Sequence, residues 1–89
     1  MVSIKRVVLD VLKPHEPNVL ELANAIAELG DDYWVRLTVI ELDKNTETLQ
    51  LEVTGNDLDF PLIESRLKEM GASLHSIDEV DAQNVSVTK

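Results

Sequence analysis

Hydrophobic and polar residues follow two different periods along the chain. Alternation with a period of two is typical of strands, and it predicts strands over 4–12, 33–43, 48–54 and 73–80. Apolar residues that recur every three or four positions predict amphipathic helices over 18–29 and 59–70. The predicted order is therefore strand–helix–strand, repeated once. Two such units folded together form one antiparallel sheet with both helices on one face.

Both predicted helices begin and end at residues that suit helix termini. Asn18 and Asp59 are suitable N-caps, because their side-chain oxygens can accept hydrogen bonds from the first turn. Gly30 and Gly71 follow the two helices, and glycine favours the left-handed conformation that ends a helix. We therefore expect both glycines to act as C-terminal caps.

The length and composition predict one small domain. The 89 residues suffice for a single core, which we place at 1–82, with 83–89 as a tail or a short edge strand. The chain contains no cysteine, which excludes disulfides and thiolate metal sites. No apolar run approaches the roughly 18 residues of a membrane-spanning helix, and the first residues do not resemble a signal peptide. We expect a cytoplasmic protein without a membrane partner.

Apolar residues are predicted on both faces of the sheet, although the helices can cover only one face. Within 4–12, the alternating residues Val7, Leu9 and Val11 are apolar and are expected to face the helices. The other set is also half apolar, which indicates that the second face meets protein rather than water. We predict an oligomer interface on that face and its edges, formed by Ile4, Val8, Leu12, Trp34 and Ile40.

Three segments resemble an uncharacterised archaeal family, domain of unknown function 211. They are IKRVVLDVLKPHEP at 4–17, GNDLD at 55–59 and LHSIDEV at 74–80, and the resemblance covers nearly the whole chain. It implies a ferredoxin-like α+β fold with element order βαββαβ, in which the four-stranded antiparallel sheet has the order 4-1-3-2. It also implies assembly into closed homo-oligomeric rings, and it implies no established activity.

The charge of the chain argues against nucleic acid as a partner. It has 17 acidic and 8 basic residues, a net charge of −9, whereas affinity for nucleic acid comes largely from Lys and Arg that neutralise phosphates. RNA-recognition domains with this element order stack bases on aromatic residues of the two central strands. The corresponding segments, 4–12 and 48–54, contain no aromatic residue.

One group of polar residues is predicted to gather where the first strand ends beside the start of the last. Antiparallel pairing places Asp10 near His75, with His15 and Glu16 in the loop just beyond. Such a set can bind a small ligand or a divalent metal, or supply a histidine–carboxylate acid–base pair. Alternatively, Asp10 only orients His75 as a hydrogen-bonded pair. The sequence leaves these three interpretations open.

A second polar group lies toward the other end of the same two strands. Asp78, Glu79 and Asp81 are predicted near Lys5 and Arg6, where ion pairing would account for them. The alternative is a hard cation, because calcium and magnesium bind several carboxylate oxygens. Calcium or magnesium is thus the candidate cofactor, at Asp78, Glu79 and Asp81.

These observations favour a non-enzymatic module that assembles with copies of itself, as a scaffold or a regulatory assembly. Unpaired sheet edges need covering, and strand 33–43 of one copy can meet strand 73–80 of the next in a head-to-tail contact that closes into a ring. The first alternative is a regulatory domain that binds a small ligand or a divalent metal at one of the two polar groups. The second is an enzyme that uses the histidines and carboxylates.

Overall fold

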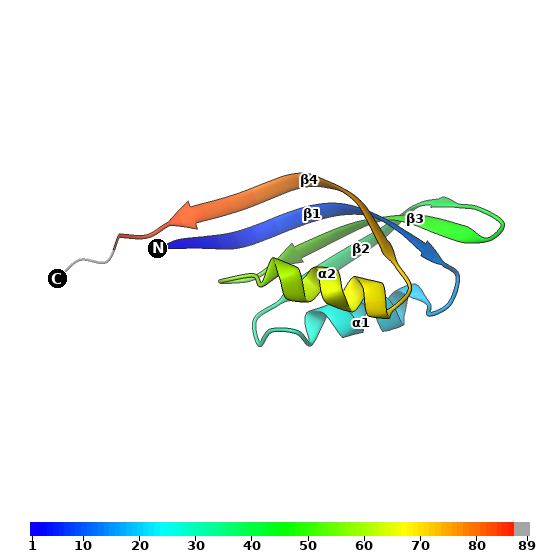
Figure 1. Cartoon of the computed structure of the whole chain (residues 1–89), viewed down its shortest axis with the longest axis horizontal. Coiled ribbons are helices and arrows are strands. Elements are labelled where there is room, and N and C mark those ends of the chain that lie inside the picture. The colour runs from blue at the N-terminus through cyan, green and yellow to red at the C-terminus, as the bar shows by residue number, and fades with distance from the viewer. Residues whose placement is uncertain (87–89) are drawn as a thin grey trace.

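Six elements alternate in the order that the sequence predicts. The structure is a computed structural model that describes residues 1–86, so the end of the predicted tail at 87–89 lies outside the described residues. The elements are β1 (Val2–Pro14), α1 (Val19–Ala27), β2 (Trp34–Leu42), β3 (Thr46–Thr54), α2 (Phe60–Glu69) and β4 (Ser73–Asn84) (Figure 1). The four strands form one antiparallel sheet of order β2-β3-β1-β4. This is the ferredoxin-like α+β fold with the predicted strand order.

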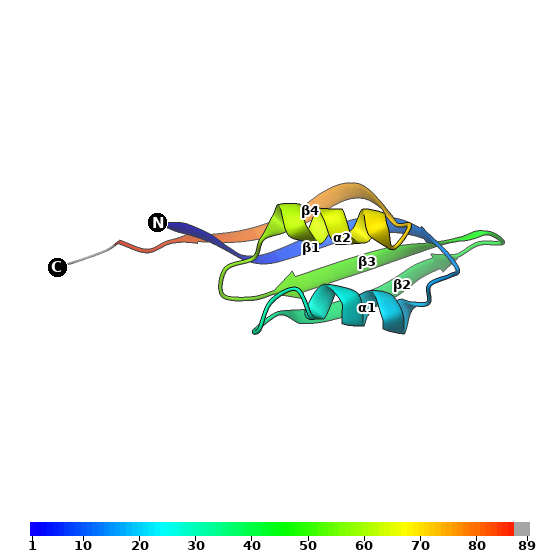
Figure 2. The same ribbon diagram turned by 60° about the horizontal axis from the view of Figure 1, so that its bottom comes forward.

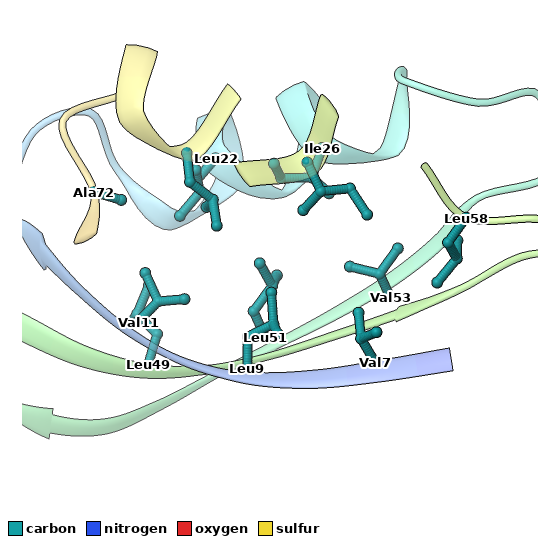
Figure 3. Packing of buried hydrophobic residues seen from close by; sticks show 12 residues of the cluster. Val7, Leu9, Val11, Leu22, Ile26, Leu49, Leu51, Val53, Leu58 and Ala72 are labelled. Atoms are coloured by element: carbon teal, nitrogen blue, oxygen red, sulfur yellow. The ribbon is translucent and has the colours of Figure 1, made fainter. Parts of the chain in front are cut away.

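The core lies between the two helices and one face of the sheet. Both helices cover the same face (Figure 2), and the side chains between the layers are aliphatic (Figure 3). Leu22 and Ile26 of α1 and Ile63 and Leu67 of α2 are fully buried there. The sheet contributes the predicted alternate residues of its two central strands, namely Val7, Leu9, Val11, Leu49, Leu51 and Val53. We call the opposite side, which carries no helix, the open face.

The helix N-termini form as predicted. Asn18 Oδ1 accepts a hydrogen bond from the Glu21 amide at 2.9 Å, and the Glu21 carboxylate accepts one from the Asn18 amide at 3.3 Å. This reciprocal capping box fixes the start of α1. Asp59 Oδ1 accepts from the Leu62 amide at 3.2 Å and caps α2. None of the helices in residues 1–86 is long and apolar enough to cross a membrane.

Only one of the two glycines acts in the predicted way. Gly71 has a φ of 78° and ends α2 in the left-handed conformation. The prediction for Gly30 is wrong, because Gly71 alone among residues 1–86 has a positive φ, and α1 already ends at Ala27. A Cβ atom at Gly30 would instead overlap the ring of Tyr33. Glycine is needed at position 30 for the close approach of that ring.

Irregular pairing between β1 and β4 changes which side of the sheet some residues face. The register shifts at three places, and one of them lies between Ile4 and Arg6 of β1. A bulge inserts one residue and turns the strand by one position. Ile4 consequently packs against the core cluster, so its predicted place on the open face is wrong.

The last strand runs beyond its predicted end and builds an arm together with β1. β4 reaches Asn84, whereas β3 stops at Thr54, opposite Arg6. The carbonyls of Ile4 and Lys5 still accept hydrogen bonds from the Leu58 and Gly55 amides, at 2.9 and 3.0 Å. Within residues 1–86, Val2 and Ser3 pair with β4 alone, and this two-stranded arm projects beyond the helices (Figure 1). At its tip, the ammonium group of Met1 donates to the Asn84 side chain at 3.1 Å, and the Val85 amide donates to the Met1 carbonyl at 2.9 Å.

Candidate functional site

The predicted cluster of two histidines and two acids is divided between two separate pairs. His75 Nδ1 lies 3.2 Å from Asp10 Oδ2, as the strand topology predicts. His15 instead contacts Glu47 and the backbone of Lys44. The Glu16 side chain is exposed and makes no hydrogen bond or ion pair within residues 1–86. The prediction of one four-residue site is therefore wrong, although the juxtaposition of Asp10 with His75 is confirmed.

The Asp10–His75 pair, which we call the outer pair, lies on the open face. His75 is the extra residue at a register shift of β4, between Leu74, opposite Val11, and Ser76, opposite Asp10. The bulge turns its side chain toward Asp10 and solvent, and 76% of that side chain is exposed. The carboxylate thereby orients the imidazole without burying it.

Two shallow depressions adjoin the outer pair, and Asp10 lines both of them. The first holds about 270 Å³ between β1, β3 and the edge strands, with Ile40, Gln50 and Asp78 on its walls. The second holds about 180 Å³ and is lined by Leu12, Thr48 and His75. Both are open to solvent, so they offer a surface for contact rather than an enclosed cavity.

The three acids proposed as a cation site do not converge on one point. Glu79 accepts a hydrogen bond from Arg6 at 2.8 Å, and Asp81 lies 3.8 Å from the same guanidinium. Asp78 accepts a hydrogen bond from the Ser76 hydroxyl at 2.7 Å. Within residues 1–86, no group of three or more His, Asp or Glu side chains is arranged to hold a metal ion. These carboxylates therefore do not fit the calcium or magnesium site predicted for them.

Arg6 is the centre of this ion-pair network on the open face. Its Nε donates to Glu52 at 2.6 Å, and the hydrogen bond with Glu52, followed by that with Glu79, raises the pKa of the guanidinium. Glu52 and Glu79 are also the cross-strand partners of Val8. Val8 is buried although it lies outside the core cluster, which indicates that this network covers it. Lys5, in contrast, donates to Asn56.

A buried lysine that the sequence pattern did not predict lies at the end of the core. Lys13 is only 1% exposed, and its Nζ lies 3.2 Å from Glu47 Oε1, which belongs to the residue paired with it on β3. The same Nζ donates to the carbonyls of Pro14 at 2.7 Å, Pro17 at 2.6 Å and His15 at 3.3 Å. Glu47 Oε1 is buried and makes no aligned hydrogen bond, so its contact with Lys13 is one of charge. A buried charge needs such partners, and here the loop carbonyls supply most of them.

His15 completes this cluster from the loop that follows β1. Its Nδ1 lies 2.9 Å from Glu47 Oε2, and its Nε2 lies 2.9 Å from the carbonyl oxygen of Lys44. The hydrogen bond with Glu47 is the main cause that raises the pKa of His15, and the Lys44 carbonyl adds to it. The same bond lowers the pKa of Glu47, against the effect of burial and with the help of Lys13. We call Lys13, His15 and Glu47 the inner cluster.

The predicted interface residues are only partly on the surface. Leu12, Trp34 and Ile40 are exposed, whereas Val8 is buried. The Arg36 guanidinium lies 5.3 Å from the centre of the Trp34 ring, which is a cation–π contact on the edge strand β2. Further apolar side chains of the edge strands are also exposed, although the prediction did not include them: Val39, Leu42, Ile77 and Val80.

Comparison with known proteins identifies relatives of this chain without assigning them a function. The sequence model of the family of uncharacterised ArCR proteins, domain of unknown function 211, matches residues 5–89. The chain is also 44% identical over 82 residues to the uncharacterized protein MJ0319 of Methanocaldococcus jannaschii, an alignment that covers 92% of this chain and 84% of the relative. This chain therefore belongs to the uncharacterised archaeal family known as domain of unknown function 211.

Proposed function

We propose that this protein is a non-enzymatic module that assembles with copies of itself through the edges of its sheet. The observation that carries the proposal is the apolar character of both edge strands. Trp34, Ile40 and Leu42 on β2 are exposed, and so are Ile77 and Val80 on β4. An edge strand with exposed apolar residues is a ready template for pairing with another chain.

The strand directions suit a contact between β2 of one copy and β4 of the next. Both β2 and β1 run antiparallel to β3, and β4 runs antiparallel to β1. The two edge strands of one copy therefore run in opposite directions. Placing β4 beside β2 of the next copy continues the antiparallel alternation and keeps all helices on one side. Such a head-to-tail contact closes into a ring where the rotation between copies allows it.

The charges of the two edge strands favour this contact over a two-fold pairing of identical edges. Arg36 on β2 makes no ion pair within residues 1–86, and its guanidinium is exposed beside Trp34. β4 carries the acidic residues Asp78, Glu79 and Asp81. Pairing β4 with another β4 would bring like charges together, which is destabilising, whereas pairing it with β2 brings Arg36 toward acids.

The assembly is tested by light scattering of the full chain at micromolar concentration, since one chain has a mass of 10.0 kDa. We expect a multiple of this mass for the natural sequence and association about tenfold weaker for Arg36→Glu, because the change replaces attraction by repulsion. Lys68→Glu is the matched control, because it makes the same charge change at an exposed residue of α2, outside both edge strands. A natural sequence that is monomeric under these conditions would rule out the proposal.

A small-ligand regulatory domain is the second candidate function. It is supported by the outer pair, because two depressions meet at Asp10 and the larger one also carries Asp78. Two carboxylates without a basic residue between them suit a cationic ligand. Titration calorimetry with calcium, magnesium, zinc and manganese tests metal ions as that ligand. Heat from any of them that disappears in Asp10→Asn would support this candidate, and no heat from all four would count against a metal-responsive domain.

A further inference from the structure

Both ring nitrogens of His15 face hydrogen-bond acceptors. Nδ1 lies 2.9 Å from a carboxylate oxygen of Glu47, and Nε2 lies 2.9 Å from the carbonyl oxygen of Lys44. A neutral imidazole carries one N–H and can donate to only one of them, whereas an imidazolium donates to both. A protonated Glu47 would also satisfy Nδ1, but the Lys13 ammonium 3.2 Å from the other oxygen favours the carboxylate form. The geometry therefore requires a protonated His15.

The charged groups around His15 come from three parts of the fold. Within residues 1–86, Glu47 at the start of β3 is the only carboxylate bonded to it, and Lys13 from β1 is the cation on the far side of that carboxylate. The turn between β2 and β3 contributes the backbone carbonyls of Asp43 and Lys44. Glu16, next along the loop, is exposed. Glu47 and the two backbone carbonyls favour the charged form of His15. Lys13 opposes it only weakly, because three carbonyls of residues 14–17 and Glu47 already offset the charge of Lys13.

His15 joins two segments that are far apart in the sequence. On one side is the loop 14–17, whose carbonyls are gathered around Lys13. On the other side is the turn between β2 and β3, closed by a hydrogen bond from the Asp43 amide to the Thr46 carbonyl at 2.9 Å. Lys13 therefore fixes the loop, and His15 attaches the turn to it.

We infer that His15 is a proton-controlled latch, which as an imidazolium holds the turn between β2 and β3 to the loop 14–17. Loss of its proton leaves a nitrogen lone pair facing either Glu47 or the Lys44 carbonyl. One of the two hydrogen bonds is then replaced by a contact between two acceptors, and the turn is released on that side. This inference does not rest on the proposed assembly, because the latch lies within one chain.

The pH range in which the latch holds follows from the two groups that form it. The pKa of His15 is raised above its ordinary value of 6.5 by Glu47, so the stabilisation is complete below 6.5 and is lost as the pH rises through the folded pKa. The pKa of Glu47 is lowered below 4.5, mainly by His15, so its stabilisation is present above 4.5 and is lost as the pH falls through its folded value. The latch is closed between these two titrations.

Nuclear magnetic resonance on the full chain tests the latch with two measurements. The first is the titration of the His15 imidazole, and the second is the exchange protection of the Asp43 amide at a series of pH values. The pKa and the protection are linked, because the same proton stabilises the closed turn and raises the pKa of His15. Across the titration, protection of the Asp43 amide should fall about tenfold for each pH unit by which the pKa of His15 exceeds that of histidine in an unfolded peptide. His15→Gln should show weak protection at every pH and no step. His75→Gln should keep the step and is the matched control.

A raised pKa of His15 together with a matching loss of protection supports the latch. It is overturned if His15 titrates at the value of an unfolded peptide, or if protection of the Asp43 amide does not follow its titration. A step that persists in His15→Gln or disappears in His75→Gln would overturn it as well. Glu47→Gln offers a second check, because it should lower the pKa of His15 toward that of the peptide. The His15 variants decide the question even where Glu47→Gln does not fold.

Discussion

The outer pair and the inner cluster contain the same chemical groups, a histidine and a carboxylate, in very different surroundings. In the outer pair the two groups are 3.2 Å apart and 76% of the His75 side chain is exposed. In the inner cluster they are 2.9 Å apart, Glu47 is 12% exposed, and a buried lysine lies behind it. Water weakens the first interaction, whereas it competes less with the second, which lies beside the buried ammonium group of Lys13.

This difference gives the inner cluster a structural role, whereas the outer pair is a feature of the surface. The inner cluster connects β1, the loop after it and the turn between β2 and β3, so it acts on the position of whole segments. The outer pair connects only two neighbouring strands that are already paired along their length. A histidine beside a carboxylate is thus no indication of a site by itself, because its consequences depend on what the two side chains connect.

The largest effect is expected when the inner cluster loses its lysine. Lys13→Met leaves Glu47 without its buried cation and three loop carbonyls without a donor, so we expect a loss of about 3–5 kcal/mol in the free energy of unfolding. Urea denaturation measures it. The matched control is Lys68→Met, the same change at an exposed site of α2, which should stay within about 0.5 kcal/mol. A loss for Lys13→Met no larger than that of the control would show that the inner cluster is not structural.

Replacing both charged partners sharpens the same comparison. The double variant Lys13→Met with Glu47→Leu removes the unpaired charge as well as its partner, so it should be more stable than Lys13→Met alone. Urea denaturation of the two single variants and the double variant measures the coupling. Additive losses would contradict the contact between the two side chains.

An intermediate and pH-dependent effect is expected for His15. The difference in the free energy of unfolding between the natural sequence and His15→Gln should be largest between the titrations of Glu47 and His15. It should shrink as the pH rises through the raised pKa of His15, and also as it falls through the lowered pKa of Glu47. Urea denaturation at a series of pH values measures this difference. A difference that is constant from acid to alkaline pH would contradict the assignment of His15 as the titrating partner.

The smallest effect is expected for the outer pair. His75→Gln removes an exposed contact with Asp10, and we expect a loss of about 0.5 kcal/mol or less in the free energy of unfolding, since exposed pairs contribute little. The same denaturation series measures it. A loss as large as that of His15→Gln at neutral pH would remove the distinction between the two pairs.

The fold was predictable because it depends on periods that the sequence displays. The helix-facing residues of β1 and β3 alternate without interruption, and the capping residues Asn18 and Asp59 stand where the helices begin. The position of Ile4 was not predictable, because it depends on a bulge in the pairing of β1 with β4. The role of Gly30 depends on the ring of Tyr33, which reaches it only in the folded chain.

The candidate site was predictable only where strand pairing fixes it. Asp10 and His75 lie in paired strands, so the topology predicts that they are neighbours, whereas the bulge at His75 sets the direction of its side chain. The direction of His15 depends on a loop between two prolines, where no periodic pattern exists. Lys13 and Glu47 continue the buried alternation of β1 and β3, which is the one signal that could have revealed the inner cluster. It is easily overlooked, because lysine and glutamate are rarely buried unless they are paired.

The arm formed by β1 and β4 determines how the fold would respond to mechanical force. Met1 is hydrogen-bonded to Asn84 and Val85. A force that pulls Met1 away from Val85 therefore acts at one end of an antiparallel pair of strands. The load then falls on one pair of backbone hydrogen bonds at a time, and the strands unzip instead of shearing along their length. Val2 and Ser3 would separate from β4 first, since no third strand within residues 1–86 pairs with them. The fold would therefore yield gradually at its ends, before the core between helices and sheet bears any load.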